Sequence, residues 1–193
     1  MSAPMDAART NPIEGGASYK LSHRLFRLAW NVVWALLASW TPPFMRGWRR
    51  WLLRRFGATI DDTAGVYGSA QIWYPPNLTM GAHAYIGPGA IVYCMAPITL
   101  DDYAIVSQRA HLCAGTHNID DPNFQLEVRP IRIGRRGWVA AEAFVGPGVT
   151  IGEGAVLGGR AVAFRDLKPW GVYSGNPAGW LRERRVRFSE QED

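Results

Sequence analysis

The sequence predicts an all-β protein of the parallel β-helix kind, because aliphatic residues recur at every sixth position over most of the chain. The spacing is cleanest from Ile133 to Leu157, with Val139, Val145 and Ile151 between them. Small residues, mostly Gly or Ala, fill the positions where a short strand must turn. Neither the period of about 3.6 residues of a helix nor the period of about 2 of a half-buried strand fits this pattern. Three short strands per coil would form a triangular prism, in which equivalent residues of successive coils stack about 4.8 Å apart.

Residues 1–18 precede any regular pattern. They are small and polar, and they are interrupted by Pro4, Pro12 and two consecutive glycines that begin at Gly15. Such a segment buries too little apolar surface to offset the entropy of ordering the chain. We expect it to be disordered.

Residues 19–57 form an expected N-terminal helical segment. In its first half, apolar residues with helical spacing make one apolar side: Leu21, Leu25, Leu28, Val32 and Leu36. Ser22 is a candidate N-cap, and the two prolines that end at Pro43 terminate this helix. A second helix is expected over residues 44–56, with Gly57 as its stop.

This segment does not predict a membrane-spanning helix, because its apolar run over residues 28–40 is shorter than the roughly twenty residues that a span needs. Two roles fit it: packing on the body of the protein, or lying at the inner face of a membrane. Basic residues spaced by three or four positions make a stripe on the second helix: Arg46, Arg49, Arg50 and Arg54. Such a stripe is either solvated or faces anionic lipid or an acidic partner.

Residues 58–168 carry the repeat. The six-residue repeat begins at Ile60, and its frame shifts by two residues after Leu78 and again after Val92. Each offset fits a wider turn at a corner of the prism, and prolines mark these corners: Pro75, Pro76 and Pro97. Residues 118–130 have no six-residue phase and are expected to leave the coil as a loop. The length of the repeat predicts about six coils.

Residues 169–193 are expected to form a C-terminal strap and a basic tail. Four arginines crowd this tail: Arg182, Arg184, Arg185 and Arg187. The net charge of +5 is therefore concentrated near both ends of the chain. We expect no nucleic-acid partner, because no nucleic-acid-binding motif accompanies the basic residues.

The composition is that of a globular protein, with 48% hydrophobic and 19% charged residues. Two cysteines, Cys94 and Cys113, are too few for a disulfide framework and favour a reducing compartment. Both lie within the repeat, where we expect small core hydrophobes rather than nucleophiles.

Chemistry is expected where the repeat is interrupted, since function tends to lie on loops held by a rigid scaffold. His117 stands at that point, and its imidazole is either a general base near neutral pH or a hydrogen-bonding cap of the turn. A zinc site would need ligands that converge at about 2.0–2.1 Å from the metal, and the candidates are His83, His111 and His117. Residues six apart lie on adjacent faces of a prism, so we expect no metal within one subunit.

Several pieces of the sequence carry a resemblance to a known protein family. They run through the repeat and beyond it, at residues 73–78, 97–99, 107–108, 112–117, 130–133, 140–144, 146–152 and 175–178. Residues 30–34 and 47–50 match as well, so the likeness covers about 19–187. In these pieces the chain resembles hexapeptide-repeat acetyltransferases of the colanic-acid-biosynthesis type. More distantly, it is similar to galactoside and maltose O-acetyltransferases.

The resemblance implies a left-handed parallel β-helix that assembles as a homotrimer, with active sites in the clefts between subunits. It implies an acetyl-CoA-dependent O-acetyltransferase whose catalytic histidine falls on His117. That base would take the proton of a sugar hydroxyl, which attacks the thioester carbonyl of acetyl-CoA directly, so that no acyl-enzyme forms. Acetyl-CoA is then a co-substrate, and no metal is expected.

The resemblance also implies donor contacts at five positions: Trp138, Ala141, Gly159, Phe164 and Arg165. The indole would border the donor, the two small residues would hydrogen-bond the pantetheine arm through their backbones, and Arg165 suits the coenzyme phosphates. Another phosphate-binding arginine of the galactoside enzymes falls on Gly179 in this chain, so Arg182 or Arg184 would replace it.

On the acceptor side, Asn118 stands where close relatives have Asp, so the role of a carboxylate there does not carry over. Asp120, Asp121 and Phe124 either line the acceptor or have plain loop roles. Glu142 either orients His117 or the acceptor across the cleft, or is an ordinary solvated turn residue.

The leading hypothesis is a cytoplasmic O-acetyltransferase that modifies a precursor of an exopolysaccharide or cell-envelope glycan and can contact the inner face of the membrane. One alternative is a zinc lyase like the gamma-class carbonic anhydrases, which metal analysis would identify. The other is a non-catalytic β-helix scaffold, which would neither bind coenzyme nor be stabilised by it.

Overall fold

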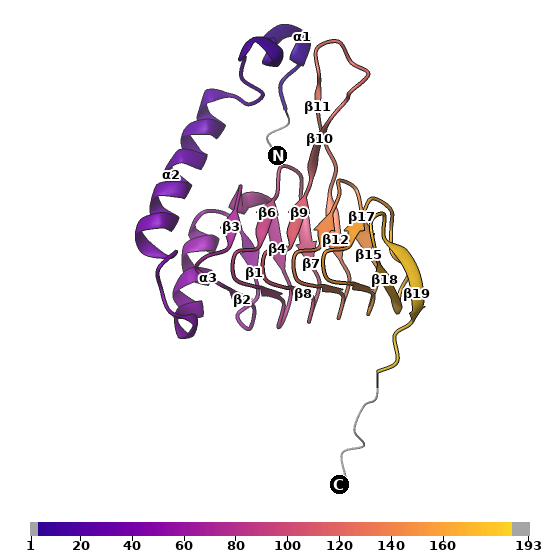
Figure 1. Cartoon of the computed structure of the whole chain (residues 1–193). Coiled ribbons are helices and arrows are strands. Elements are labelled where there is room, and N and C mark those ends of the chain that lie inside the picture. Colours follow the sequence, from indigo (N-terminus) through magenta and orange to yellow (C-terminus); the bar gives the residue numbers. More distant parts are fainter. Residues whose placement is uncertain (1–3, 187–193) are drawn as a thin grey trace.

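Three parallel sheets form the sides of a β-solenoid of about six turns, which the computed structural model describes over residues 4–186 (Figure 1). Sheet A contains, in spatial order, β1 (Thr59–Ile60), β4 (Leu78–Met80), β7 (Ile98–Leu100), β12 (Ile131–Ile133) and β15 (Thr150–Ile151). Sheet B contains β2 (Gly65–Val66), β5 (Tyr85–Ile86), β8 (Ile105–Val106), β13 (Trp138–Val139), β16 (Val156–Leu157), β18 (Gly171–Ser174) and β19 (Gly179–Glu183). Sheet C contains β3 (Gln71–Ile72), β6 (Ile91–Tyr93), β9 (His111–Cys113), β14 (Phe144–Val145) and β17 (Val162–Ala163). Arg187 of the predicted tail lies outside the described residues.

The aliphatic residues at every sixth position point into the solenoid. In sheet A, Ile133 pairs with Leu100 on one side and Ile151 on the other, and all three side chains are completely buried. Both two-residue offsets are absorbed between sheets C and A: the first by the 3₁₀ turn η3 (Pro75–Asn77) before β4, and the second in the segment between β6 and β7. The parallel β-helix predicted from the six-residue repeat is confirmed.

A β-hairpin interrupts the repeat between β9 and β12 and projects from the solenoid (Figure 1). It consists of β10 (Gly115–His117) and β11 (Leu126–Val128), which pair antiparallel with His117 opposite Leu126. The sequence predicts this departure over residues 118–130. In the structure it begins at Gly115, so His117 belongs to the first strand of the hairpin.

The residues before the first long helix fold against this hairpin (Figure 1). They form α1 (Ala7–Thr10) and η1 (Pro12–Glu14). The Ala7 N–H donates to Gln125 Oε1 (2.7 Å), and Gln125 Nε2 donates to the carbonyl of Met5 (3.2 Å). In the structure a hairpin glutamine thus supplies hydrogen-bond partners for the backbone of this segment, while the disorder expected for residues 1–18 stays a prediction.

Helix α2 (Leu21–Leu37) packs on the solenoid through its aromatic side. Trp30 and Trp34 are buried, and their indole N–H groups donate to carbonyls of the first coil at 2.6–3.1 Å. The leucine side faces away from the solenoid, and its members are all exposed: Leu21, Leu25, Leu28, Val32 and Leu36. Ser22 does not cap the helix, whose N-cap position is Lys20.

A short turn, η2 (Pro43–Met45), leads into α3 (Arg46–Arg55), which covers the first coil. Arg49 is only 1% exposed, and its Nε donates to the carbonyl of Val66 (2.6 Å). Arg50 and Arg54 likewise donate to first-coil carbonyls. The predicted basic stripe is thus largely a cap for backbone groups that have no neighbouring strand.

The opposite end of the solenoid is closed by β19, which pairs antiparallel with β18. Arg184 holds this strap in place, because its Nη1 donates to the carbonyls of Arg136 and Gly154 at 2.9 Å each. Of the helices in residues 4–186, none is long and apolar enough to cross a membrane.

Candidate active site

The hairpin fixes both the position and the tautomer of His117. Its Nδ1 lies 2.8 Å from the carbonyl oxygen of Phe124. A carbonyl oxygen only accepts hydrogen bonds, so in the neutral imidazole Nδ1 carries the proton and Nε2 has the lone pair. The Phe124 ring stacks on the imidazole, with centroids 4.4 Å apart and planes inclined by 13°. The imidazole is therefore held ready to accept a proton at Nε2.

His117 lines a cavity of about 420 Å³ between the hairpin, the segment before α2, and α2 itself. Other walls come from Tyr19, Arg24, Arg27, Trp73, Tyr93 and Met95. The Arg27 guanidinium lies over the Trp73 ring, 4.2 Å from its centroid. Burial raises the pKa of Tyr19 to about 12, which keeps its hydroxyl a neutral donor. Hydrogen-bonding groups beside aromatic rings suit a polar organic ligand.

The predicted acceptor-side residues of the hairpin shape its turn. Asn118 Oδ1 accepts from the N–H of Asp120 (3.1 Å), and Asp121 Oδ1 accepts from the N–H of Asn123 (2.7 Å). Side-chain-to-backbone bonds of this kind are common turn devices. Asp120 itself is exposed. The structure thus gives Asn118 and Asp121 loop roles, and contact with an acceptor stays a prediction.

Three of the predicted donor-side residues lie together at the corner between sheets B and C. Trp138 is 40% exposed, and its Nε1 donates to Ser107 Oγ (2.9 Å). The Ala141 carbonyl accepts from the N–H of Arg160 on the next coil (2.9 Å), and a Cβ on Gly159 would meet only that carbonyl, at 3.5 Å. Within the described chain, the N–H groups of Ala141 and Gly159 have no acceptor. Two free backbone donors beside an exposed indole fit a pantetheine arm.

Glu142 occupies the same corner and is held by two arginines. Its carboxylate accepts from Arg160 Nε (2.5 Å) and from Arg109 on the preceding coil. The hydrogen bonds from Arg160 and then Arg109 lower the pKa of this carboxyl. Within one chain, Glu142 therefore binds these two arginines and does not orient His117. The Phe124 carbonyl orients His117. The role of Glu142 across a cleft stays a prediction.

The remaining donor-side candidates are exposed cations and one exposed ring. Phe164 and Arg165 follow β17 directly, at the edge of sheet C from which the hairpin also leaves. Arg182 lies on β19 and is exposed, whereas the guanidinium of Arg184 donates to backbone carbonyls of the solenoid. Of the two arginines that the sequence offers for a phosphate, Arg182 is the one left available.

One chain does not bring His117 to the donor corner, the corner that carries Trp138, Ala141 and Gly159. His117 follows the end of β9, whereas Ala141 and Gly159 lie before the starts of β14 and β17. These three strands are parallel and adjacent in sheet C. His117 therefore lies at the edge formed by the C-terminal ends of the strands, and Ala141 and Gly159 lie at the edge formed by their N-terminal ends. A site that contains both would need a second copy of the chain.

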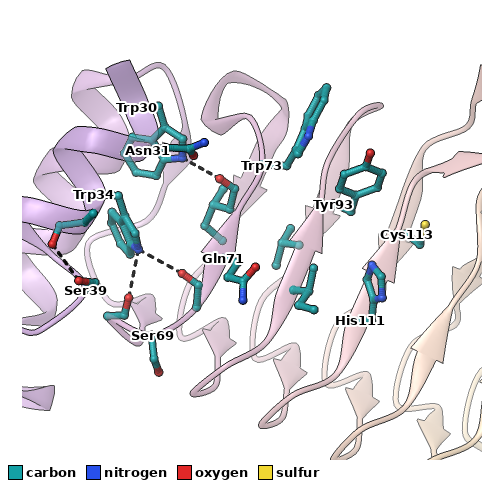
Figure 2. A pocket seen from close by; sticks show the side chains of 16 residues that line it. Trp30, Asn31, Trp34, Ser39, Ser69, Gln71, Trp73, Tyr93, His111 and Cys113 are labelled. Carbon is teal, nitrogen blue, oxygen red and sulfur yellow. Dashed lines mark hydrogen bonds between the residues drawn. The ribbon is translucent and has the colours of Figure 1, made fainter. Parts of the chain in front are cut away.

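A larger groove of about 630 Å³ runs between α2 and the outer face of sheet C (Figure 2). Trp34 lines it from the helix, and Tyr93 and His111 line it from β6 and β9. Trp73 and Tyr93 border both this groove and the His117 cavity. Sequence reasoning missed the groove, although large rings directly after inward aliphatics, as in Ile72-Trp73, were a signal for a covered outer face.

The three candidate zinc histidines lie in different parts of the solenoid. His83 stacks on Tyr103 at a corner, with centroids 4.8 Å apart, whereas His111 lies in β9 and His117 in the hairpin. No group of three or more His, Cys, Asp or Glu side chains suited to a metal occurs in residues 4–186. Cys94 is completely buried, and burial raises the pKa of its thiol to about 12.

Comparison with known proteins gives relatives along most of the chain, although no protein-family model matches it. The chain is 39% identical over 155 residues to the putative colanic acid biosynthesis acetyltransferase WcaF of Escherichia coli (strain K12), covering 80% of this chain and 85% of that protein. It is 25% identical over 138 residues to the galactoside O-acetyltransferase of the same strain, covering 70% of this chain and 68% of that protein.

A solved structure of a galactoside acetyltransferase in complex with coenzyme A shares the fold. It matches with a TM-score of 0.80 over 96% of this chain and 97% of that chain. The sequence identity in this match is 20%, so it bears on architecture alone.

Proposed function

The chain belongs to the hexapeptide-repeat acetyltransferases, and on this premise we propose that it transfers acetyl groups from acetyl-CoA to a sugar hydroxyl. The names of the WcaF and galactoside relatives support a sugar acceptor, and the coenzyme A complex of a structural neighbour supports the donor. The acceptor in this proposal is a precursor of an exopolysaccharide or cell-envelope glycan. No observation among the described residues favours a zinc lyase or a non-catalytic scaffold.

The observation that carries the proposal is the bond between His117 Nδ1 and the Phe124 carbonyl, because it leaves a basic Nε2 beside a cavity. In the reaction, Nε2 takes the proton of the sugar hydroxyl as the oxygen attacks the thioester carbonyl carbon. The tetrahedral intermediate then loses the C–S bond, and the leaving thiolate takes the proton back from the imidazolium. The products are an acetyl ester and coenzyme A with a free thiol.

The donor lies along the corner between sheets B and C in this proposal. Trp138 borders it with the exposed indole, and Ala141 and Gly159 offer their free N–H groups to the pantetheine arm. Phe164 adds an apolar surface at the other edge of sheet C. Arg165 and Arg182 are exposed cations that suit the phosphates. The acceptor side consists of the hairpin residues and the corner carboxylate: Asn118, Asp120, Asp121, Phe124 and Glu142.

We propose a homotrimer in which each site lies at a seam between subunits. The outward residues of sheet A are polar: Thr59, Thr79, Thr99, Arg132 and Thr150. Sheet B, and sheet C beyond the part that α2 covers, instead present large apolar side chains, such as Tyr85, Ile105, Trp138 and Phe144. Burying these two faces against neighbours would bring the donor corner of one chain to the hairpin of another.

We place the enzyme in the cytoplasm as part of the same proposal. The two cysteines are unpaired, which suits a reducing compartment, and acetyl-CoA is an intracellular metabolite. Contact with a membrane is a separate proposal, because it rests on α2 and not on the site.

Turnover of acetyl-CoA with glycan acceptors tests the assigned base. The His117→Ala enzyme should lose about 10²–10⁴-fold in kcat/KM, while KM for acetyl-CoA changes little, because a positioned base is typically worth that much. His83→Ala is the matched control, since His83 is an exposed histidine at a corner of the solenoid. A His117→Ala enzyme with wild-type kcat/KM would reject the proposed mechanism.

A further inference from the structure

Helix α2 has two apolar faces, and the solenoid covers only one of them. The covered face carries His23, Trp30 and Trp34. A helix turns by about 100° per residue, so the leucine stripe lies on the opposite side. This leucine face comprises Leu21, Leu25, Leu28, Val32 and Leu36, which are 65%, 55%, 59%, 48% and 66% exposed. A continuous apolar stripe in water indicates an interaction surface.

Exposed aromatic residues follow the leucine face in the chain, after the end of the helix and in α3. Trp40 is 70% exposed, and its Nε1 donates to the carbonyl of Leu36 (2.8 Å). Phe44 is 82% exposed. Trp48 is also exposed and donates from Nε1 to the carbonyl of Leu37 (2.7 Å). Indole rings at the border of an apolar surface are typical of proteins at a membrane–water interface.

The segment around the leucine face is strongly basic. Between Glu14 and Asp61 the sequence has no Asp or Glu but has eight Lys or Arg residues. Arg49, Arg50 and Arg54 use their guanidinium groups to bond first-coil carbonyls. Four other cations remain exposed: Lys20, Arg24, Arg46 and Arg55. This charge is complementary to an anionic lipid surface.

We propose that the leucine face, with Trp40 and Phe44, docks in the headgroup region of an anionic bilayer, with α2 parallel to its surface. Charge disfavours a second copy as the occupant, because two such faces would bring cations together with no carboxylate to pair them. The outer faces of sheets B and C already offer apolar surface for self-assembly. Arg24 and Arg27 of α2 also line the His117 cavity, so docking would hold that cavity near the lipid.

Flotation of the purified full-length protein with vesicles tests this proposal. The protein should float with vesicles that contain phosphatidylglycerol at low salt, and about tenfold less with phosphatidylcholine alone or at high salt. Leu28→Glu should reduce flotation about tenfold, because it places a carboxylate in the contact. Leu181→Glu is the matched control: Leu181 is 60% exposed on β19, at the other end of the solenoid, and its variant should float as the wild type does.

Four further measurements keep the outcome unambiguous: the Tm, tryptophan fluorescence, acetyl transfer and the molar mass. An unchanged Tm shows that Leu28→Glu is folded, and brominated lipids should quench tryptophan fluorescence in the wild type. Acetyl transfer to a water-soluble acceptor should be the same in both, so the docking proposal does not depend on the proposed reaction. The proposal is overturned if the wild type does not float with anionic vesicles, or if Leu28→Glu floats with them as much as the wild type does. It is also overturned if Leu28→Glu lowers the molar mass, which would identify a second copy as the occupant.

Discussion

His117 owes its geometry to a backbone atom and a ring from its own hairpin. The Nδ1 partner is the Phe124 carbonyl, which lies across the turn and remains whatever side chain stands at that position. The stacked Phe124 ring limits rotation of the imidazole. No carboxylate is needed to select the tautomer of His117, and Glu142 instead binds Arg160 and Arg109 at the corner between sheets B and C.

Neither cysteine is needed if the hydroxyl attacks the thioester directly. Cys94 is completely buried with a raised pKa, and Cys113 Sγ lies 3.2 Å from the Gly115 carbonyl. Cys94→Ala and Cys113→Ala should each keep kcat/KM within about threefold of the wild type. Initial rates with both substrates varied should give intersecting patterns. Ping-pong kinetics that disappear in either variant would instead reveal an acyl-enzyme.

Acid should destabilise the protein in part through His23. Its ring packs against Tyr19, Trp73 and Tyr74, and burial, followed by the charge of Arg27, lowers its pKa below the usual 6.5. The unfolded chain therefore binds this proton at a higher pH than the folded chain does. His23 therefore does not lower the free energy of unfolding above about pH 6.5. Below that pH, protonation of His23 in the unfolded chain makes the free energy of unfolding fall.

Thermal melts between about pH 8 and pH 5 measure this loss. His23→Phe keeps an aromatic ring in the cluster but cannot bind a proton, so its Tm should fall less steeply with acid than that of the wild type. Equal slopes for the two proteins would assign the pH dependence to another group.

At the scale of elements, α2 and α3 close a sheet edge that the first coil would otherwise leave open. Successive carbonyls of this coil accept side-chain N–H groups from the helices: those of Ile60, Ala64, Val66, Gly68, Ala70 and Ile72. The donors are Arg54, Arg50, Arg49, Trp34 and Trp30. The abundance of Trp and Arg in this segment is therefore explained by edge capping.

Arg49→Met should be a damaging substitution in this cap. The side chain is 1% exposed and donates to the carbonyls of Val66 (2.6 Å) and Pro42 (2.9 Å) and to the hydroxyl of Thr41 (2.8 Å). Methionine leaves these acceptors without donors, so the free energy of unfolding should fall by about 2–4 kcal/mol. Urea denaturation measures the change. Arg55→Met, at an exposed position of the same helix, should leave the midpoint unchanged, and equal losses in both variants would contradict a capping role for Arg49.

The sequence predicts the two helices but not which side of each is covered. Helix α2 is apolar on both sides, so periodicity cannot tell the covered aromatic side from the exposed leucine side. The arginines of α3 look like a solvated stripe because sequence spacing does not show that Arg49 points at a backbone edge. Those contacts are set by residues far along the chain, such as Val66.

At the scale of the whole molecule, the solenoid was predictable because a period of six fixes which residues point inward. Ile133 and Ile151 occupy the same face for that reason. The placement of His117 beside an interruption was predictable too. Its tautomer was not, since it depends on Phe124 across a hairpin that the sequence showed only as a loss of phase.

No single chain is expected to contain a complete site. The hairpin with His117 and the donor corner with Gly159 lie at opposite edges of sheet C. In solution, light scattering should give about three times the chain mass of 21.4 kDa. Each of the three seams would then join the hairpin of one subunit to the donor corner of the next.

Subunit complementation tests this seam most directly. His117→Ala removes the base, and Gly159→Phe places a ring in the donor corner, where a Cβ would make only an ordinary contact, 3.5 Å from the Ala141 carbonyl. Each variant alone should be inactive. When the two are co-assembled in equal amounts, about one site in four combines an intact hairpin with an intact corner, so about a quarter of the wild-type activity should return. Verified mixed trimers that remain inactive would show that one chain supplies both halves, which would contradict the account.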